Sequence, residues 1–132
     1  MKEYNSVLKF LSYKVNEVTL KTNEEFVEEK EGTPISLSIK PTITIEEKKM
    51  NIKLTVEIFK NAKEKNYPFE MIVETTGFFE AEDEKPEKFV KNAIAILYPY
   101  VRALVSTYTA NANINPLILP AINVNKLIED QK

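Results

Sequence analysis

A strict alternation of apolar and polar side chains, which ends near Glu80, constrains the fold of this chain more than any other feature. Residues 35–45 carry Ile or Leu at alternate positions, and residues 50–58 repeat the pattern. Because successive side chains of a strand point to opposite faces, this alternation predicts two strands with one buried face. Pro41 interrupts the first and lacks the N–H that a central strand donates. We therefore expect that strand at a sheet edge or bent at Pro41.

Two further segments complete the expected sheet. In residues 7–20 the apolar positions change from odd to even, which predicts a bulge or bend near Asn16-Glu17. Residues 67–73 form a fourth alternating stripe. An acidic crossing loop over residues 23–32 and a polar turn over 61–66 separate the strands. Four such strands predict an antiparallel sheet.

After Glu80 the apolar spacing becomes helical, with apolar residues every three or four positions from Phe89 to Tyr108. Acidic Glu82, Asp83 and Glu84 before Pro86 suit a helix N-terminus. The apolar stripe covers most of the helix, so we expect packing partners on more than one side.

Pro99 should kink or divide this helix. A Pro- and Asn-rich run follows residue 111, and a short last helix is expected after a cap at Asn123. The order of elements predicts one α+β domain over residues 1–132, with a four-stranded antiparallel sheet, a long helix and a short C-terminal helix.

Composition excludes most catalytic chemistry. The 132 residues include no Cys and no His, which removes thiol nucleophiles, Ser-His pairs and the usual zinc sites. Gly32 and Gly77 are the only glycines, too few for a phosphate-binding loop. A net charge of −2 with a single arginine, Arg102, argues against a nucleic-acid groove. We expect no cofactor, no metal and no nucleic-acid partner.

Carboxylates are the only acid–base candidates. The cluster Glu80, Glu82, Asp83 and Glu84 lacks the ligand spacing of a calcium loop, so we interpret it as solvated surface. Tyr98, Tyr100 and Arg102 could orient a substrate, but no base lies nearby, and packing on the sheet is the favoured interpretation. We expect that the chain is not an enzyme. A small-ligand enzyme acting through Glu80, Glu82 and Glu84 stays open as a third hypothesis.

No segment has the roughly 18 apolar residues of a membrane span. Glu3 and Asn5 lie where a signal peptide requires an uncharged apolar stretch, so a cytoplasmic protein without membrane insertion is expected.

Apolar residues also occur where exposure is expected. Phe26 lies in the charged crossing loop, Phe78 and Phe79 are neighbours on a strand, and residues 114–119 are apolar without a helical rhythm. Together they predict either an oligomer that buries the long helix or a groove of apolar side chains and exposed backbone for an extended peptide.

Four stretches resemble the SecB family of bacterial export chaperones. Residues 97–102, Leu-Tyr-Pro-Tyr-Val-Arg, resemble the family's Leu-Phe-Pro-Tyr-Ala-Arg helix motif. Residues 115–123 are similar to its proline-bounded loop, Gly77-Phe78-Phe79 to the end of its fourth strand, and residues 35–39 to its second strand.

The resemblance implies an ATP-independent holdase, assembled as a homotetramer (a dimer of dimers) with helices between two eight-stranded sheets. Unfolded polypeptide would lie in apolar grooves. The peptide-binding residues implied are Phe26, Ile35, Leu37, Ile39, Phe78, Phe79, Ile114, Leu117 and Leu119. The oligomer-interface residues implied are Leu97, Tyr98, Val101, Arg102 and Val105.

The sequence also departs from the family member that serves the translocase motor SecA, which has an acidic sheet face and a C-terminal tail. Glu17 matches one acidic position, but Lys21 and Ile72 replace others, and the chain ends at Lys132 without that tail. Two hypotheses follow: a holdase whose clients are unfolded preproteins for export through the Sec pathway, or a SecB-fold module dedicated to a single partner, for example an antitoxin, without SecA.

Overall fold

The computed structural model describes residues 8–82 and 85–130 and contains one antiparallel sheet. Its strands are β1 (Leu8–Thr22), β2 (Leu37–Glu46), β3 (Lys49–Ile58) and β4 (Phe69–Ala81), in the spatial order β1-β4-β3-β2. A short helix, α1 (Ala62–Lys65), connects β3 to β4. The predicted α+β class and the edge position of β2 are confirmed. Val7, Glu3, Asn5, Asp83 and Glu84, on which sequence expectations were based, lie outside the described residues.

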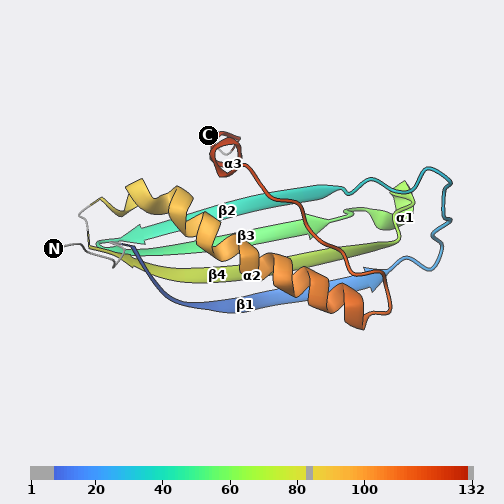
Figure 1. Cartoon of the computed structure of the whole chain (residues 1–132), viewed down its shortest axis with the longest axis horizontal. Coiled ribbons are helices and arrows are strands. Elements are labelled where there is room, and N and C mark those ends of the chain that lie inside the picture. Colours follow the sequence, from blue (N-terminus) through green and yellow to red (C-terminus); the bar gives the residue numbers. More distant parts are fainter. Residues whose placement is uncertain (1–7, 83–84, 131–132) are drawn as a thin grey trace.

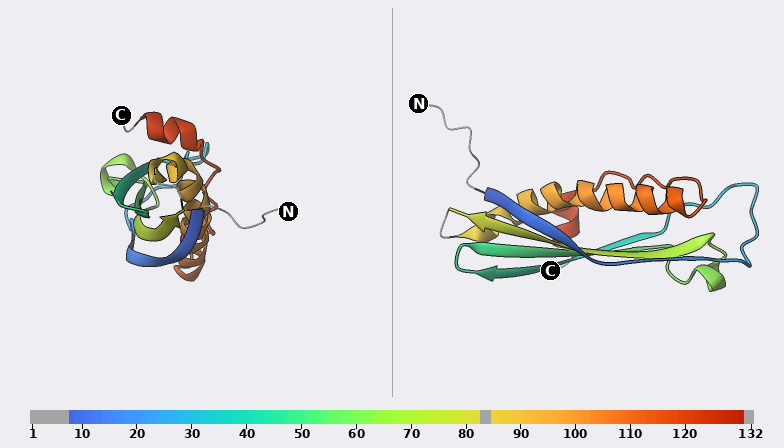
Figure 2. Two further views of the ribbon diagram at one scale, coloured as in Figure 1. Left: turned by 90° about the vertical axis from the view of Figure 1, so that its left-hand side faces the viewer. Right: turned by 90° about the horizontal axis from the view of Figure 1, so that it is seen from below.

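A second layer is formed by α2 (Val90–Asn111), which runs diagonally across one face of the sheet (Figure 1, Figure 2). It follows a short 3-10 turn at Pro86–Phe89, named η1. The last helix, α3 (Val124–Glu129), contacts α2, and the cap at Asn123 is confirmed because its side chain accepts a hydrogen bond from the amide of Lys126 at 3.1 Å. In the described part of the chain, no helix has the length and apolar character needed to cross a membrane.

Pro99 lies inside α2, and the helix continues through it as one element. Of the two outcomes expected at Pro99, division of the helix is therefore excluded, and a kink stays a prediction. A proline costs the helix one backbone hydrogen bond, but Leu97, Tyr98 and Val101 around it are buried against the sheet. Burial of these side chains on both sides of Pro99 outweighs the lost hydrogen bond.

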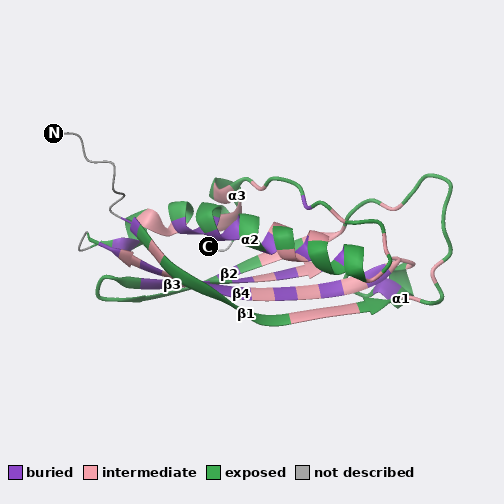
Figure 3. Ribbon diagram, turned by 60° about the horizontal axis from the view of Figure 1, so that its bottom comes forward, coloured by how far each residue is buried: buried purple, intermediate pink, exposed green. Residues whose placement is uncertain are grey.

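The hydrophobic core lies between α2 and the inner face of the sheet, the face that α2 covers. Figure 3 shows buried residues alternating with less buried ones along β3 and β4. On β3 the residues Met50, Ile52, Leu54, Val56 and Ile58 have no exposed surface. Gly77 of β4 marks a close approach of α2, because a Cβ atom there would lie 2.8 Å from Phe79 Cε2 and 3.1 Å from Leu97 Cδ1.

The two edge strands differ in regularity. The pairing of β1 with β4 shifts register between Phe10 and Ser12 and again between Val15 and Glu17, which confirms the predicted irregularity near Asn16 and adds one at Leu11. The pairing of β2 with β3 runs without a shift from Leu37 opposite Ile58 to Glu46 opposite Lys49. Pro41 is included in this register, so it does not interrupt β2.

Candidate functional site

A hollow of about 290 Å³ lies between the edge strand β2 and the C-terminal segment. Its walls are the half-buried side chains of Leu37 and Ile39 from β2 and of Ile122 and Leu127 from the region of α3. Lys126 and Asp130 lie at its rim with Asn123. We call this hollow the β2–α3 groove. It combines an apolar lining with the free edge of a sheet.

Side chains of α2 hold the segment that forms one side of this groove. The Tyr98 hydroxyl donates to the carbonyl of Pro120 at 2.7 Å, Arg102 Nε to that of Leu119 at 3.1 Å, and the Ser106 hydroxyl to that of Leu117 at 3.0 Å. Residues four apart lie on one face of a helix. The extended segment 117–120 is therefore attached along α2, and this attachment places α3 opposite β2.

Thr109 extends this polar stripe, because its hydroxyl accepts a hydrogen bond from the amide of Leu117 at 2.9 Å and donates to the carbonyl of Val105 at 2.8 Å. Sequence reasoning missed the roles of Ser106 and Thr109. The signal was present as polar residues at positions 98, 102, 106 and 109 of a helix that is otherwise largely apolar.

Burial raises the pKa of the Tyr98 hydroxyl above its usual value, and the nearby Arg102 guanidinium opposes this shift by favouring the phenolate. The hydroxyl therefore keeps its proton at neutral pH. That proton is the one donated to the carbonyl of Pro120.

The structure separates the implied peptide-binding residues. Leu37 and Ile39 line the β2–α3 groove, and Ile35 precedes β2 with 43% of its surface exposed. Phe79 and Leu119 have no exposed surface, because both belong to the core, so neither presents a contact to a ligand in this structure. The remaining members are half-buried: Phe26, Phe78, Ile114 and Leu117.

Phe26 and Phe78 lie away from the β2–α3 groove. Phe26 belongs to the crossing loop, which the side chain of Asn66 holds through bonds to both the amide and the carbonyl of Val27, each at 2.9 Å. Phe78 lines a separate hollow of about 310 Å³ with Leu11 and Asn51. This hollow and the groove are thus two separate areas of the surface.

The implied interface residues of α2 are used within the chain. Leu97, Val101 and Val105 have no exposed surface, Tyr98 has 4%, and all four pack in the core. Arg102 is half-buried and bonds segment 117–120. Because they are buried within the chain, these residues leave little surface for contact with a second copy of it.

Part of the exposed apolar surface of α2 lies beside β1. Ring centroids of Tyr13 and Tyr100 are 4.6 Å apart, those of Phe10 and Tyr100 are 5.5 Å apart, and Phe10 contacts the buried ring of Phe79 at 5.2 Å. Tyr13 and Tyr100 each remain 38% exposed. We call Phe10, Tyr13 and Tyr100 the aromatic patch.

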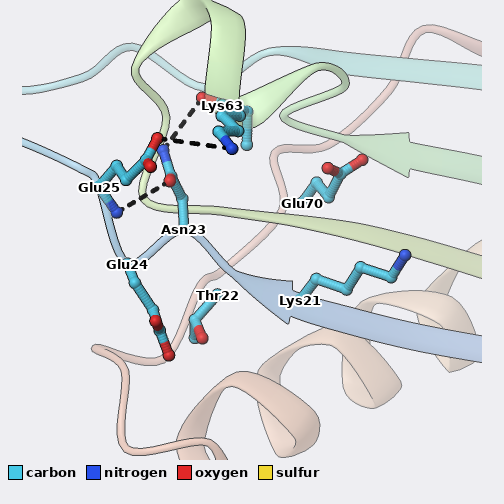
Figure 4. A pocket seen from close by; sticks show the side chains of 8 residues that line it. Lys21, Thr22, Asn23, Glu24, Glu25, Lys63 and Glu70 are labelled. Atoms are coloured by element: carbon cyan, nitrogen blue, oxygen red, sulfur yellow. Dashed lines mark hydrogen bonds and ion pairs between the residues drawn. The ribbon is translucent and has the colours of Figure 1, made fainter.

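A charged hollow of about 320 Å³ lies where the crossing loop meets α1 (Figure 4). Lys63 and Glu25 form an ion pair of 3.8 Å in it, and the Asn23 side chain donates to the carbonyls of Ala62 and Tyr67. Lys21 and Glu70 carry opposite charges on neighbouring strands. These contacts anchor the crossing loop to the region of α1, and we interpret the hollow as part of this anchor.

Of the acidic cluster singled out in the sequence, the described members Glu80 and Glu82 make separate contacts. Glu80 is half-buried opposite Lys9 of β1, and Glu82 forms an exposed ion pair with Lys9 at 3.5 Å. Among residues 8–82 and 85–130, no three acidic side chains are arranged to hold a metal ion. On the outer face of the sheet, Glu17 is paired with Glu74 and Lys21 with Glu70.

Comparison with known proteins identifies relatives of this chain. Residues 9–132 match the family described as "Preprotein translocase subunit SecB". An uncharacterized protein of Methanocaldococcus jannaschii, MJ0357, is 40% identical over an alignment of 124 residues that covers 89% of this chain and 79% of that protein.

Two solved structures share the fold at low sequence identity. The SecB-like chaperone Rv1957 of Mycobacterium tuberculosis, in complex with a ChAD peptide from the Rv1956 HigA1 antitoxin, superposes with a TM-score of 0.68 at 16% identity, covering 88% of this chain and 91% of that one. A protein of unknown function from Streptococcus agalactiae gives a TM-score of 0.54 at 17% identity, with coverages of 86% and 97%.

Proposed function

The chain belongs to the SecB family, and from this premise we propose that it is an ATP-independent chaperone that holds unfolded polypeptide. The observation that carries the proposal is the β2–α3 groove, where apolar side chains of an edge strand and of α3 face one another. Each client side chain fully buried there contributes about 1.5–3 kcal/mol. Contacts of this kind select client segments that are apolar and do not require one particular sequence. A chaperone that holds many unfolded chains needs this broad selectivity.

In this proposal the working form is a homotetramer in the cytoplasm, and the aromatic patch supplies contact between copies. Exposed aromatic side chains beside an edge strand are a common element of such interfaces. Light scattering should give the mass of an assembly, and a monomeric mass at all accessible concentrations would contradict this part of the proposal.

In a more specific version of this proposal, the chain delivers its clients to SecA for protein export. The pairing of Glu17 with Glu74 supports it, since it brings two carboxylates together on the outer face. Lys21 beside Glu70 weakens the acidic character of that face. Binding of purified SecA, measured with and without a Glu17→Lys substitution, tests this form separately from client holding.

Client holding is tested by suppression of aggregation of a chemically denatured protein. Leu127→Asp places a charge in the β2–α3 groove, on a helix with no buried residue, so the fold should be retained. We expect this variant to lose most of the suppression. Asn125→Asp adds the same charge to an exposed position of α3 and should retain it. Equal suppression by both variants would show that the groove is not the binding site.

A chaperone dedicated to a single partner is the alternative function. It is favoured by the fold shared with Rv1957, whose structure contains a peptide from an antitoxin. Under this alternative the chain binds one protein tightly and leaves the aggregation of denatured test proteins unchanged. The suppression assay with wild-type protein therefore separates the two functions.

A further inference from the structure

The chain leaves α2 through a reversal that is closed by both oxygen atoms of Thr109. Its backbone carbonyl accepts a hydrogen bond from the amide of Ile114 at 3.2 Å, and its hydroxyl accepts one from the amide of Leu117 at 2.9 Å. Asn113, in the left-handed conformation with a φ of 61°, turns the chain just before Ile114. Thr109 has no exposed surface. One buried residue therefore holds both ends of the short turn 114–117.

The other hydrogen bonds along α2 do not determine which residue of the returning segment lies where. Every residue has a carbonyl, so a segment displaced by one residue could also bond the three side chains that donate to segment 117–120. These donors are Tyr98, Arg102 and Ser106. Thr109 differs, because its own proton is donated to the carbonyl of Val105 at 2.8 Å. Toward the segment its hydroxyl is an acceptor, which requires an N–H.

Burial opposes only one of the two displacements by a single residue. Side chains of an extended segment alternate between two faces, and here Leu119 has no exposed surface whereas Ile118 is 70% exposed. Moving Pro120 into the site of Leu119 would replace leucine by the smaller proline and leave a cavity. Moving Ile118 into this site costs little, because Leu and Ile gain similar free energy on burial.

The displacement that buries Ile118 is the one that Thr109 opposes. It would bring Pro116 to the place of Leu117, and proline has no N–H to donate to the Thr109 hydroxyl. The accepted hydrogen bond would be lost at a site without exposed surface, which is costly. The hydroxyl therefore distinguishes two registers that the carbonyl bonds and burial leave nearly equal.

We propose that the Thr109 hydroxyl sets the register of segment 117–120 along α2, and thereby positions Ile122 and α3 at the β2–α3 groove. Thr109 is a positioning residue in this proposal and contacts no client. One residue of extended chain is about 3.3 Å long. A displaced register would move Ile122 by about this distance relative to Leu37 and Ile39 on the opposite wall. The link to clients rests on the proposed chaperone function, but the register can be measured without clients.

The test measures the distance between β2 and α3. The chain has no Cys, so spin labels can be attached at Ser38→Cys and Asn125→Cys, which are both exposed positions. Labelled chains are diluted into an excess of unlabelled chains, so that only distances within one chain are recorded. Without Thr109→Val the labels should give one distance. With Thr109→Val, the amide of Leu117 has no acceptor in the native register. We therefore expect a second distance, which differs by up to about 3.3 Å. A single, unchanged distance would overturn the proposal.

Two control variants separate the hydroxyl from the rest of the side chain. Thr109→Ser keeps the hydroxyl and should restore the single distance. Thr107→Val is the same substitution at an exposed position of α2 and should leave the distance unchanged. All distances are measured well below the melting temperature of each variant, so a loss of stability alone does not alter them. A second distance in Thr109→Ser, as large as in Thr109→Val, would assign the effect to the methyl group and contradict the proposal.

Ile118→Asp distinguishes a displaced segment from a loose one. The substitution adds a charge at a position that is exposed in the native register, but the displaced register would bury the carboxylate in the site of Leu119. The variant Thr109→Val/Ile118→Asp should therefore return to a single distance, as in Ile118→Asp alone. Two distances that persist in the double variant would exclude a displaced register and overturn the proposal.

Suppression of aggregation relates the register to the proposed function. The fraction of suppression that Thr109→Val loses should match the fraction of its chains at the second distance. The double variant should suppress as well as Ile118→Asp alone. Full suppression by chains at the second distance would support Thr109 as the residue that sets the register, but it would remove the β2–α3 groove as the client site. Wild-type protein that fails to suppress aggregation would overturn the proposed function alone.

Discussion

The strands β1 and β2 both lie at edges of the sheet, but β1 shifts register twice and carries the aromatic patch, whereas β2 keeps an unbroken register with Pro41 in its middle. An irregular strand presents its backbone groups at uneven spacing and is a poor template for a long ladder. Its exposed rings suit a fixed contact between side chains. The edge of β2 is regular, and its apolar side chains Leu37 and Ile39 line the β2–α3 groove.

This difference relates each edge to a separate role in the proposed chaperone. Contact between copies would use the side chains of the aromatic patch, whereas client binding would use the β2–α3 groove. Both roles depend on α2, which contributes Tyr100 to the patch and the anchors of segment 117–120 to the groove. Substitutions that affect one edge and spare the other can therefore test the distinction.

The largest effect is expected from Gly77→Val, which acts on the side of the sheet next to β1. Gly77 is paired with Tyr13, and a Cβ there would be 2.8 Å from Phe79 Cε2, so an isopropyl group would push α2 away. Overpacking of this kind should lower the free energy of unfolding by about 3 kcal/mol. Chemical denaturation followed by circular dichroism measures the change.

Thr42→Val, on the exposed outer face of β2, is the control for this substitution and should change stability by less than about 0.5 kcal/mol. If Gly77→Val is tolerated equally well, the contact of α2 with β4 is not as close as the structure shows.

Tyr100→Ala should have the next largest effect, and it should act on assembly alone. Removing this ring from the aromatic patch is expected to weaken contact between copies by about 2 kcal/mol per chain. Light scattering should then give a smaller mass at low concentration. The isolated chains should still suppress the aggregation of a denatured client. Lys91→Ala, at an exposed position of α2, should leave the mass unchanged. An unchanged mass for Tyr100→Ala would remove the patch from the interface.

Tyr98→Phe tests the anchor on the β2 side, where the hydroxyl donates to the carbonyl of Pro120. Loss of this bond should cost about 1 kcal/mol and reduce client binding without reducing assembly. Because burial raises the pKa of Tyr98 in the folded state, the folded chain retains this proton at a pH where the unfolded chain releases it.

The stabilisation from this raised pKa is complete below about pH 10, the ordinary tyrosine value, and is lost as the pH rises through the raised value. Wild-type protein should therefore lose stability more steeply above pH 10 than Tyr98→Phe. Denaturation midpoints measured across this range give the comparison, and parallel curves would contradict the assigned effect of burial.

Periodicity predicted the four strands, the long helix, the Asn123 cap and the irregularity near Asn16, because each depends on residues close in sequence. Of the two outcomes expected at Pro99, a kink or a division of the helix, division does not occur, because tertiary burial of its neighbours outweighs a local penalty. The resemblance placed Leu37 and Ile39 in a groove but could not show that Phe79 and Leu119 are fully buried. Their burial depends on how α2 crosses the sheet, which no local pattern specifies.

The smallest effect is expected from Thr75→Val, between the two edges. Thr75 is paired with Val15 on one side and Leu54 on the other, has no exposed surface, and its hydroxyl has no hydrogen-bond partner. Replacing a buried, unpaired hydroxyl by a methyl group of similar size removes a desolvation cost, so the variant should be more stable by about 0.5 kcal/mol. A loss of stability in urea denaturation would show that this hydroxyl is hydrogen-bonded in solution. Assembly and client binding should both be unchanged, since Thr75 reaches neither edge.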